Sequence, residues 1–254
     1  MRHHPVTGTS AGTSSGTSAG TSSGTSAGGA PAAAVPWLWD RPAAPGTPHR
    51  PGPAGRLPEA VLFDRDGTLV ADVPYNGDPA RVSPLPTALA AVTALRELGI
   101  PVGVVSNQSG VARGLLTRED VLAVRRRVDE LFGPFDVWAV CPHGPADRCG
   151  CRKPAPGLIL AACQRLGAAP ERTVVVGDIG ADVRAASAAG ARGVLVPTPV
   201  TRPEEVAAAA ETARDLLTAV RLVSYPSASG AGRAGAHATP GAMGARPPAV
   251  GGGR

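Results

Sequence analysis

Five short, continuously apolar runs, separated by longer segments with helical spacing, constrain the fold of this chain most. The runs are four to six residues long and do not alternate with polar residues, which is typical of strands buried on both faces. Helices on both sides of a parallel sheet bury strands in this way. The sequence therefore predicts an α/β fold, a three-layer Rossmann-like arrangement with a parallel sheet between two layers of helices. The five predicted strands cover residues 60–64, 101–105, 136–140, 173–177 and 193–196.

The segments between these runs repeat apolar residues at the spacing of a helix. Thr117 is a predicted N-cap, because Glu119 and Asp120 follow in the first turn. Cys163 lies among apolar residues and is predicted to belong to the core. The run Arg125 to Arg127 is predicted to face solvent. The predicted helices cover residues 85–98, 117–131, 156–167, 182–189 and 203–222.

Both ends of the chain have a composition that does not support a folded core. Residues 1–56 and 224–254 are rich in Gly, Ala, Ser, Thr and Pro, so we expect both to be disordered tails. Pro36 to Asp40 form an apolar island in the first tail, and we expect that segment to be loosely held; docking on the domain or on a partner is the alternative. Residues 57–223 remain as one domain, which is long enough to bury a core.

The charge of the chain comes mostly from its tails. The chain has 25 basic and 20 acidic residues, but seven of the basic residues and one acidic residue lie in the tails. The predicted domain is close to neutral, so its charge does not favour binding to nucleic acid. No apolar run approaches the roughly 20 residues of a membrane span, and no signal-peptide pattern begins the chain. We expect a cytoplasmic monomer that does not contact a membrane.

Two acids follow the first predicted strand directly. Asp64 and Asp66 are one residue apart and share a face of the strand end, which is where open α/β sheets bind their ligands. Two carboxylates this close together favour a cation between them. The pattern predicts a Mg²⁺ site with a carboxylate that acts as a nucleophile or as an acid and base. The alternative is a simple Asp-Gly turn at the end of a strand.

Polar residues also follow the other predicted strands. Ser106 and Asn107 follow the second strand, Lys153 the third, and Asp178 and Asp182 the fourth. Right-handed crossovers bring these strand ends to one edge of the sheet. Lys153 is the only lysine among 25 basic residues, which indicates a role that arginine does not fill, such as binding a phosphate or a carboxylate. Asp182 can alternatively open the helix that begins there.

Three cysteines and a histidine lie within eleven residues of one another. Cys141, His143, Cys149 and Cys151 match a closed, tetrahedral Zn²⁺ site, in which the metal is structural. Free thiols or a redox pair are the alternative, but Cys-x-Cys is a poor geometry for a disulfide. Such a zinc loop holds the following residues, Arg152 and Lys153, beside the edge of the sheet that carries the acids.

Four ordered motifs in the core resemble those of the haloacid dehalogenase superfamily. They are Asp64-x-Asp66-Gly-Thr, Ser106-Asn107, Lys153 and Gly-Asp178-x₃-Asp182, and they span residues 59–200. The resemblance implies a phosphatase in which Asp64 attacks phosphorus and Asp66 serves as general acid and base. It implies a Mg²⁺ ion held by Asp64, the backbone carbonyl of Asp66, and Asp178. There is no insertion long enough for a large cap domain.

The resemblance also implies a set of residues that bind a small-molecule phosphate ester. Ser106, Arg152 and Lys153 would hold the transferring phosphoryl group, and two loops would contact the rest of the substrate. Heptose phosphatases of this superfamily have Thr where this chain has Ser106, which keeps the hydroxyl. The implied loop contacts are Asp72, Val73, Pro74, Tyr75, Asn107, Gln108 and Ser109.

Within the superfamily, the sequence resembles two kinds of phosphatase. The stretch from Asn107 to Gly114 is similar to that of heptose bisphosphate phosphatases, whereas the short gap between His143 and Cys149 is similar to that of histidinol-phosphate phosphatases. We expect removal of the 7-phosphate of a heptose 1,7-bisphosphate, with histidinol phosphate as the alternative substrate. A nucleic-acid end phosphatase and a non-catalytic binding protein are more distant alternatives, and the intact acids disfavour the second.

Overall fold

The computed structural model describes residues 35–41 and 57–224, and these contain one six-stranded sheet. The predicted disorder of the two tails concerns residues that lie almost entirely outside the described ranges. The strand order across the sheet is β1-β4-β3-β2-β5-β6, so β2 and β3 are central. The strands are β1 (Trp37–Asp40), β2 (Ala60–Phe63), β3 (Val102–Asn107), β4 (Val137–Cys141), β5 (Thr173–Gly177) and β6 (Arg192–Leu195).

Five of the strands are parallel, which confirms the predicted α/β fold. β2 pairs in parallel with β3 on one side and with β5 on the other, so that Val61 lies opposite both Val102 and Val174. The same direction continues from β3 to β4 and from β5 to β6. All five carboxyl ends therefore meet one edge of the sheet, and the loops that follow them lie side by side there.

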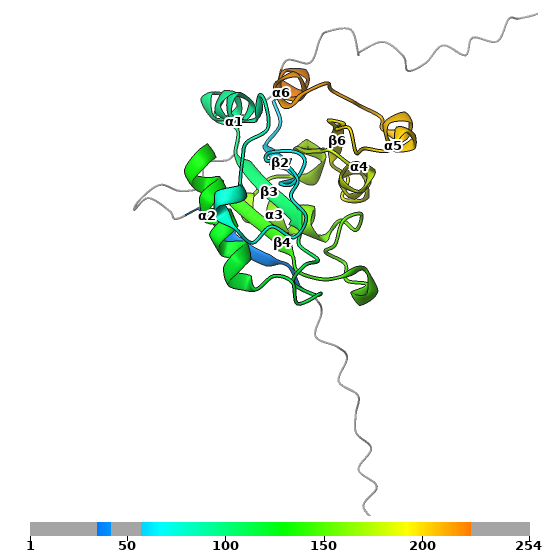
Figure 1. Cartoon of the computed structure of the whole chain (residues 1–254). Coiled ribbons are helices and arrows are strands. Elements are labelled where there is room, and N and C mark those ends of the chain that lie inside the picture. Colours follow the sequence, from blue (N-terminus) through cyan, green and yellow to red (C-terminus); the bar gives the residue numbers. More distant parts are fainter. Residues whose placement is uncertain (1–34, 42–56, 225–254) are drawn as a thin grey trace, which may run out of the picture. The chain divides into compact units, whose positions relative to one another are not determined.

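Helices cover both faces of the sheet and give the molecule three layers (Figure 1). Apolar side chains of α1, α2 and α6 pack on one face of the strands, and those of α3 and α4 pack on the other. The helices are α1 (Ala88–Glu97), α2 (Arg118–Phe132), α3 (Gly157–Leu166), α4 (Gly180–Ala188), α5 (Pro203–Ala208) and α6 (Leu216–Ser224). Three short 3₁₀ helices join them: η1 (Pro79–Arg81), η2 (Pro145–Asp147) and η3 (Pro170–Arg172).

The segment from Pro36 to Asp40 is not loosely held, so that prediction is wrong, and the alternative, docking on the domain, holds instead. It forms β1, which pairs antiparallel with β4, with Trp39 opposite Trp138. Leu38 packs on the other face of the sheet from the two tryptophans, in the layer of α3 and α4. Asp40 forms an ion pair of 2.5 Å with Arg165 of α3. The strand covers the edge of β4, whose backbone groups would otherwise be unpaired.

Arg125 does not face solvent as predicted, although it belongs to a basic run. Its guanidinium lies over the rings of Trp39 and Trp138, at 5.6 and 6.0 Å from their centroids. It also forms an ion pair of 3.4 Å with Asp129. Arg118, about two turns before it on α2, lies over the rings of Trp37 and Trp39. Two arginines of α2 therefore hold the tryptophans of β1 by cation–π contacts.

The last predicted helix, over residues 203–222, is two helices in the structure. The segment between α5 and α6 runs beside β6 instead of continuing the helix. The N–H of Leu195 donates to the carbonyl of Glu211 over 2.9 Å, and the N–H of Ala213 donates to the carbonyl of Leu195 over 2.8 Å. These bonds satisfy backbone groups at the edge of the sheet. Helix propensity is a local property of the sequence, so it could not predict this tertiary pairing.

Candidate active site

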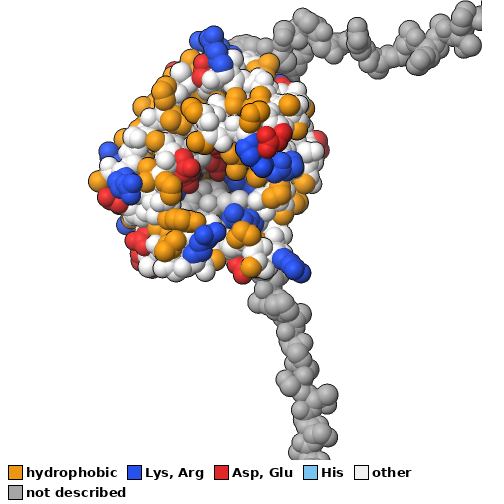
Figure 2. All heavy atoms as spheres, turned by 45° about the vertical axis from the view of Figure 1, so that its right-hand side comes forward, with side chains coloured by type: hydrophobic (Ala, Val, Ile, Leu, Met, Phe, Trp, Pro, Cys, Tyr) orange, Lys and Arg blue, Asp and Glu red, His pale blue; other side chains and the backbone are white. Residues whose placement is uncertain are grey.

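A pocket of about 280 Å³ opens at the carboxyl edge of the sheet, where the loops after β2, β3, β4 and β5 meet. Acidic and basic side chains flank a hollow in the face of the molecule drawn in Figure 2. The pocket brings together most of the predicted site residues. Its lining comprises Asp64, Arg65, Asp66, Asp72, Val73, Pro74, Tyr75, Asn107, Gln108, Ser109, Gly110, Lys153, Asp178, Ile179, Asp182 and Val200.

Lys153 lies at the bottom of this pocket, between two acids. Its Nζ is 2.5 Å from Oδ1 of Asp64 and 2.6 Å from Oδ1 of Asp182, and it donates to the carbonyl of Val105 over 2.8 Å. The ammonium thus donates hydrogen bonds to Asp64 and to the backbone, and it forms an ion pair with Asp182. Asp182 also accepts a hydrogen bond from the N–H of Ile179, so it opens α4 and binds Lys153 at once.

The acids around Lys153 carry more negative charge than one ammonium offsets. Burial raises the pKa of Asp64 well above its usual range, and Lys153 opposes the effect. Burial also raises the pKa of Asp178 to about 7, and the charge of Asp182 adds to it. Oxygens of Asp64, Asp178 and Asp182 lie within 4.8 Å of one another. A buried cluster of oxygen ligands with surplus charge fits Mg²⁺.

Asp66 lies apart from this cluster and has its own partners. Its carboxylate accepts two hydrogen bonds from Arg65, from Nε to Oδ1 over 2.9 Å and from Nη2 to Oδ2 over 2.6 Å. Gln108 donates from Nε2 to Oδ2 of Asp66 over 2.9 Å, and also to the Oγ of Ser106 over 2.9 Å. The two acids of the motif therefore occupy different surroundings, although one residue separates them.

Gly67 lets the backbone approach Asp178 closely. It has a φ of +76°, and a Cβ at this position would lie 2.3 Å from Oδ2 of Asp178. A side chain here would therefore push Asp178 out of the acidic cluster. The glycine of the Asp-Gly-Thr motif is needed for both its conformation and its lack of volume.

The predicted loop residues reach the pocket in different ways. Tyr75 is 44% exposed at the rim, where Arg113 lies over its ring at 5.6 Å. Asn107 forms two hydrogen bonds with the backbone of Lys153, one in each direction, so it fixes the loop that carries the lysine. Burial raises the pKa of Asp72, as does the charge of Asp66.

Two predicted phosphate-binding residues do not line the pocket. Ser106 is buried beneath Gln108, from which its hydroxyl accepts a hydrogen bond. Arg152 points to the Cys/His loop, where Nη1 donates to the carbonyl of His143 over 3.4 Å. Both lie next to lining residues in the chain, Asn107 and Lys153.

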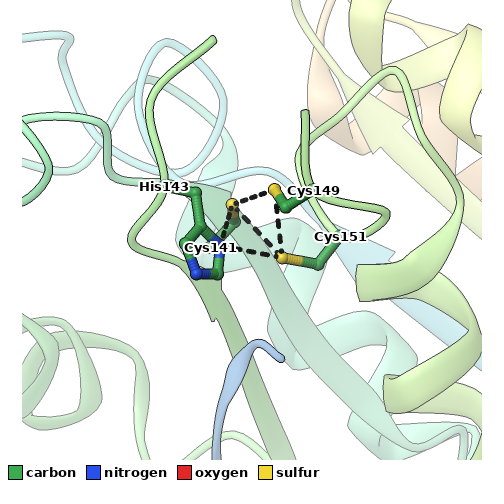
Figure 3. Close-up of side chains that lie close together, drawn as sticks. All are labelled: Cys141, His143, Cys149 and Cys151. Atoms are coloured by element: carbon green, nitrogen blue, oxygen red, sulfur yellow. Dashed lines mark hydrogen bonds between the residues drawn. The ribbon is translucent and has the colours of Figure 1, made fainter. Parts of the chain in front are cut away.

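The Cys/His loop brings its four predicted ligands together. Figure 3 shows Cys141, His143, Cys149 and Cys151 pointing toward one another. The three sulfurs are 3.4 to 3.6 Å apart, and Nδ1 of His143 is 3.2 Å from Sγ of Cys151. Tetrahedral Zn–S bonds of about 2.3 Å place sulfurs at nearly this separation.

The thiols of this cluster also lack a charge partner. Burial raises the pKa of Cys141 to about 11 and also raises the pKa of Cys151, so a bound cation would stabilise both thiolates. The cysteines form no disulfide. The donor set and its geometry therefore fit Zn²⁺, with all four positions taken by the protein.

Comparisons with known proteins identify the family. A family model described as HAD-hydrolase-like matches residues 150–221. A D-glycero-beta-D-manno-heptose-1,7-bisphosphate 7-phosphatase from Mesorhizobium japonicum is 41% identical over 150 residues, which are 54% of this chain and 69% of the relative. One of the same name from Pseudomonas putida is 38% identical over 143 residues, which are 54% of this chain and 82% of the relative. The chain belongs to the haloacid dehalogenase (HAD) superfamily.

Structural comparison agrees with this assignment. The crystal structure of a D,D-heptose 1,7-bisphosphate phosphatase from B. bronchiseptica, in complex with magnesium and phosphate, superposes with a TM-score of 0.57 at 29% identity. The match covers 64% of this chain and 96% of that one. This HAD protein is therefore a phosphatase, a phosphoric monoester hydrolase, and the predicted resemblance is confirmed. Among its described helices, none is long and apolar enough to cross a membrane.

Sequence reasoning missed several residues of this HAD site. Arg65 lies between the two motif acids, and its partnership with Asp66 was not predicted. Ile179 and Val200 are exposed apolar residues at the pocket. The signal for Arg65 was a charge placed at the end of a buried strand, which requires a partner nearby. Val200 carries no such signal, because a valine in a loop is unremarkable in sequence.

Proposed function

We propose that this phosphatase removes the 7-phosphate of D-glycero-D-manno-heptose 1,7-bisphosphate, or of a similar sugar bisphosphate, through an aspartyl phosphate on Asp64. The observation that carries the proposal is the buried Asp64, held by Lys153 at the bottom of a pocket beside Asp178 and Asp182. The names of the similar phosphatases support the choice of substrate.

Asp64 would act as the nucleophile. Lys153 occupies Oδ1, so we assign the attack on phosphorus to Oδ2. The bond from Oδ2 to phosphorus forms while the bond from phosphorus to the sugar oxygen breaks. The positive charge of Lys153 stays in place during both changes. It would therefore stabilise the negative charge that develops on the phosphoryl oxygens. Ser106 and Arg152 would complete the hold on the phosphoryl group after a change of rotamer.

Asp66 would transfer the protons of both steps. It donates a proton to the leaving sugar oxygen in the first step. In the second step it takes a proton from the water that attacks the phosphorus of the aspartyl phosphate. One carboxyl group can serve both steps, because the first leaves it as the base that the second needs.

Asp64 and Asp178 would hold Mg²⁺, together with the backbone carbonyl of Asp66. The clustered buried oxygens, and the charge that Lys153 leaves uncompensated, support this site. Bound there, the ion would neutralise part of the charge of the phosphoryl group. The Cys₃His cluster would hold a structural Zn²⁺ that keeps the loop after β4 in place beside Lys153.

A second candidate substrate is histidinol phosphate. The short gap between His143 and Cys149 supports it, because this spacing resembles that of histidinol-phosphate phosphatases. The apolar side chains of Ile179 and Val200 at the pocket would also suit a substrate with a flat ring.

A comparison of kcat/KM for both anomers of the heptose bisphosphate and for histidinol phosphate tests the substrate. We expect at least one anomer to be preferred over histidinol phosphate, and the reverse preference would replace our first choice. Asp64→Asn tests the chemistry, because an amide oxygen is a poor nucleophile. We expect it to abolish Mg²⁺-dependent phosphate release, and a variant with full activity would exclude Asp64 as the nucleophile.

A further inference from the structure

Arg65 is a buried arginine whose described hydrogen bonds all go to one acid of the pocket. Its side chain is 3% exposed, and its Nε and Nη2 donate to the two carboxylate oxygens of Asp66. A bidentate bond between guanidinium and carboxylate fixes the plane of the carboxylate as well as its position. Asp66, which is 25% exposed, would otherwise have a free rotamer at the wall of an open pocket.

The hydrogen bonds leave one oxygen of Asp66 less occupied than the other. Oδ2 accepts from both Arg65 and Gln108, which uses its two lone pairs. Oδ1 accepts one described bond, from Nε of Arg65, so it keeps one lone pair. The arrangement therefore presents a single acceptor position of the carboxylate.

The division of cations in the pocket supports a separate role for Arg65. Lys153 binds Asp64 and Asp182, whereas Arg65 binds Asp66. An acid that serves as both donor and base must lie within hydrogen-bond reach of two different oxygens in turn, the leaving oxygen and the attacking water. A fixed carboxylate with one open position meets that requirement.

We propose that Arg65 is a positioning residue that aims Oδ1 of Asp66 at the leaving oxygen, with Gln108 holding Oδ2. This inference rests on the proposed function, in which Asp66 is the general acid and base. In the first step the proton leaves Oδ1 for the sugar oxygen as its bond to phosphorus breaks. In the second step Oδ1 accepts a proton from water. Arg65 acts through Asp66 and exchanges no proton itself.

The dependence on leaving group tests this role. An alkyl leaving group, as in the heptose bisphosphate, needs a proton to depart, whereas p-nitrophenolate departs readily without one. The burst of p-nitrophenolate from p-nitrophenyl phosphate reports only the first step. In Arg65→Met we expect the kcat for the heptose bisphosphate to fall about a hundredfold and the burst rate to fall less than about fivefold. Arg65→Lys keeps a charge without the fork and should lie between.

Arg126→Met is the matched control, because Arg126 is an exposed arginine of α2 away from the pocket. It should keep both rates. An equal loss on both esters in Arg65→Met, or no loss on the alkyl ester, would overturn the role of Arg65 in an active enzyme. A wild-type protein that releases phosphate from neither ester would overturn the proposed function, and the role of Arg65 with it.

Thermal unfolding of the variants separates positioning from folding. We expect Arg65→Met and Arg65→Lys to unfold cooperatively, since Asp66 is close enough to solvent to be hydrated when Arg65 is gone. If neither variant folds, Arg65 serves the stability of the fold, and the positioning role is wrong.

Discussion

At the scale of residues, the pocket contains more buried carboxylates than buried cations. One ammonium, that of Lys153, lies between Asp64 and Asp182, and all three side chains are almost fully buried. Among the described residues, Asp178 has no ion pair, and its carboxylate accepts a hydrogen bond from the hydroxyl of Thr68 over 3.4 Å. The site is therefore balanced only when a further cation or a proton is bound, which couples its charge to folding.

Removal of the ammonium should destabilise the protein. Lys153→Met leaves two buried carboxylates without a counter-charge, and we expect the free energy of unfolding to fall by about 3 to 5 kcal/mol at neutral pH. Urea denaturation without added metal measures this loss, with Arg126→Met as the control. A loss no larger than that of the control would show that Lys153 contributes nothing to stability.

The stability of the metal-free protein should depend on pH through Asp178. Its pKa rises from an ordinary 3.8 to about 7 on folding, so the folded protein holds a proton that the unfolded chain has released. The free energy of unfolding therefore falls as the pH rises toward about 7 and levels off above it. Asp178→Asn should flatten this dependence in urea denaturation across the range. An unchanged slope in the variant would assign the effect to other groups.

At the scale of elements, the loop after β4 connects the Cys/His cluster to Lys153. Cys141 ends β4, and Cys151 is two residues before the lysine. Asn107, at the end of β3, holds the same loop by its bonds to the backbone of Lys153. The Cys/His ligands and the side-chain amide of Asn107 together define the path of this loop. We therefore expect zinc to affect the active site indirectly, through the position of Lys153.

The zinc content of the protein should depend on the four residues of the Cys₃His cluster and not on the total number of cysteines. Cys151→Ser removes a ligand, whereas Cys163→Ser changes a cysteine of α3 that bonds to Thr173 outside the cluster. Metal analysis should find one zinc per chain in the wild type and in Cys163→Ser, and less in Cys151→Ser. A chelator should also lower the midpoint of thermal unfolding, because bound metal stabilises the folded state. Wild-type protein without zinc would exclude the site.

At the scale of the whole molecule, the edges of the sheet differ. The edge of β4 is covered by β1, which comes from a part of the chain far from β4 in sequence. Cation–π contacts with Arg118 and Arg125, and the ion pair between Asp40 and Arg165, hold β1 there. β1 is then the outer strand of the sheet, and its four residues offer another chain a shorter template for pairing than the longer β4 would, so β1 protects the molecule from association.

Loss of β1 should therefore promote self-association. Trp39→Ala removes a ring from between Arg118 and Arg125, and we expect it to lower the free energy of unfolding by about 2 kcal/mol. Light scattering after size exclusion should show association that grows with concentration. Val35→Ala is the control, since Val35 precedes β1 and is 67% exposed. A variant as stable and as monodisperse as this control would contradict the protective role.

The parts that could be read from the sequence are those that depend on local pattern. Apolar runs and helical spacing identified the five parallel strands and the layers of helices, because burial on both faces leaves a direct trace in composition. The site could be placed at one edge because parallel strands and right-handed crossovers bring their carboxyl ends together. The Cys₃His spacing and the single lysine predicted two clusters whose residues do meet in the structure.

Only the tertiary structure decided which partner each polar side chain took. Asp66 binds Arg65 and not the acidic cluster, and Arg152 points to the carbonyl of His143. Trp39 belongs to the sheet because α2 and β4 offer it arginines and an open edge. The partner of each side chain depends on groups that are distant in sequence. Packing brings these groups within a few ångströms of one another, where they compete for the same hydrogen bonds and contacts. The sequence by itself determined where chemistry gathers in this protein, and packing decided which atoms face one another there.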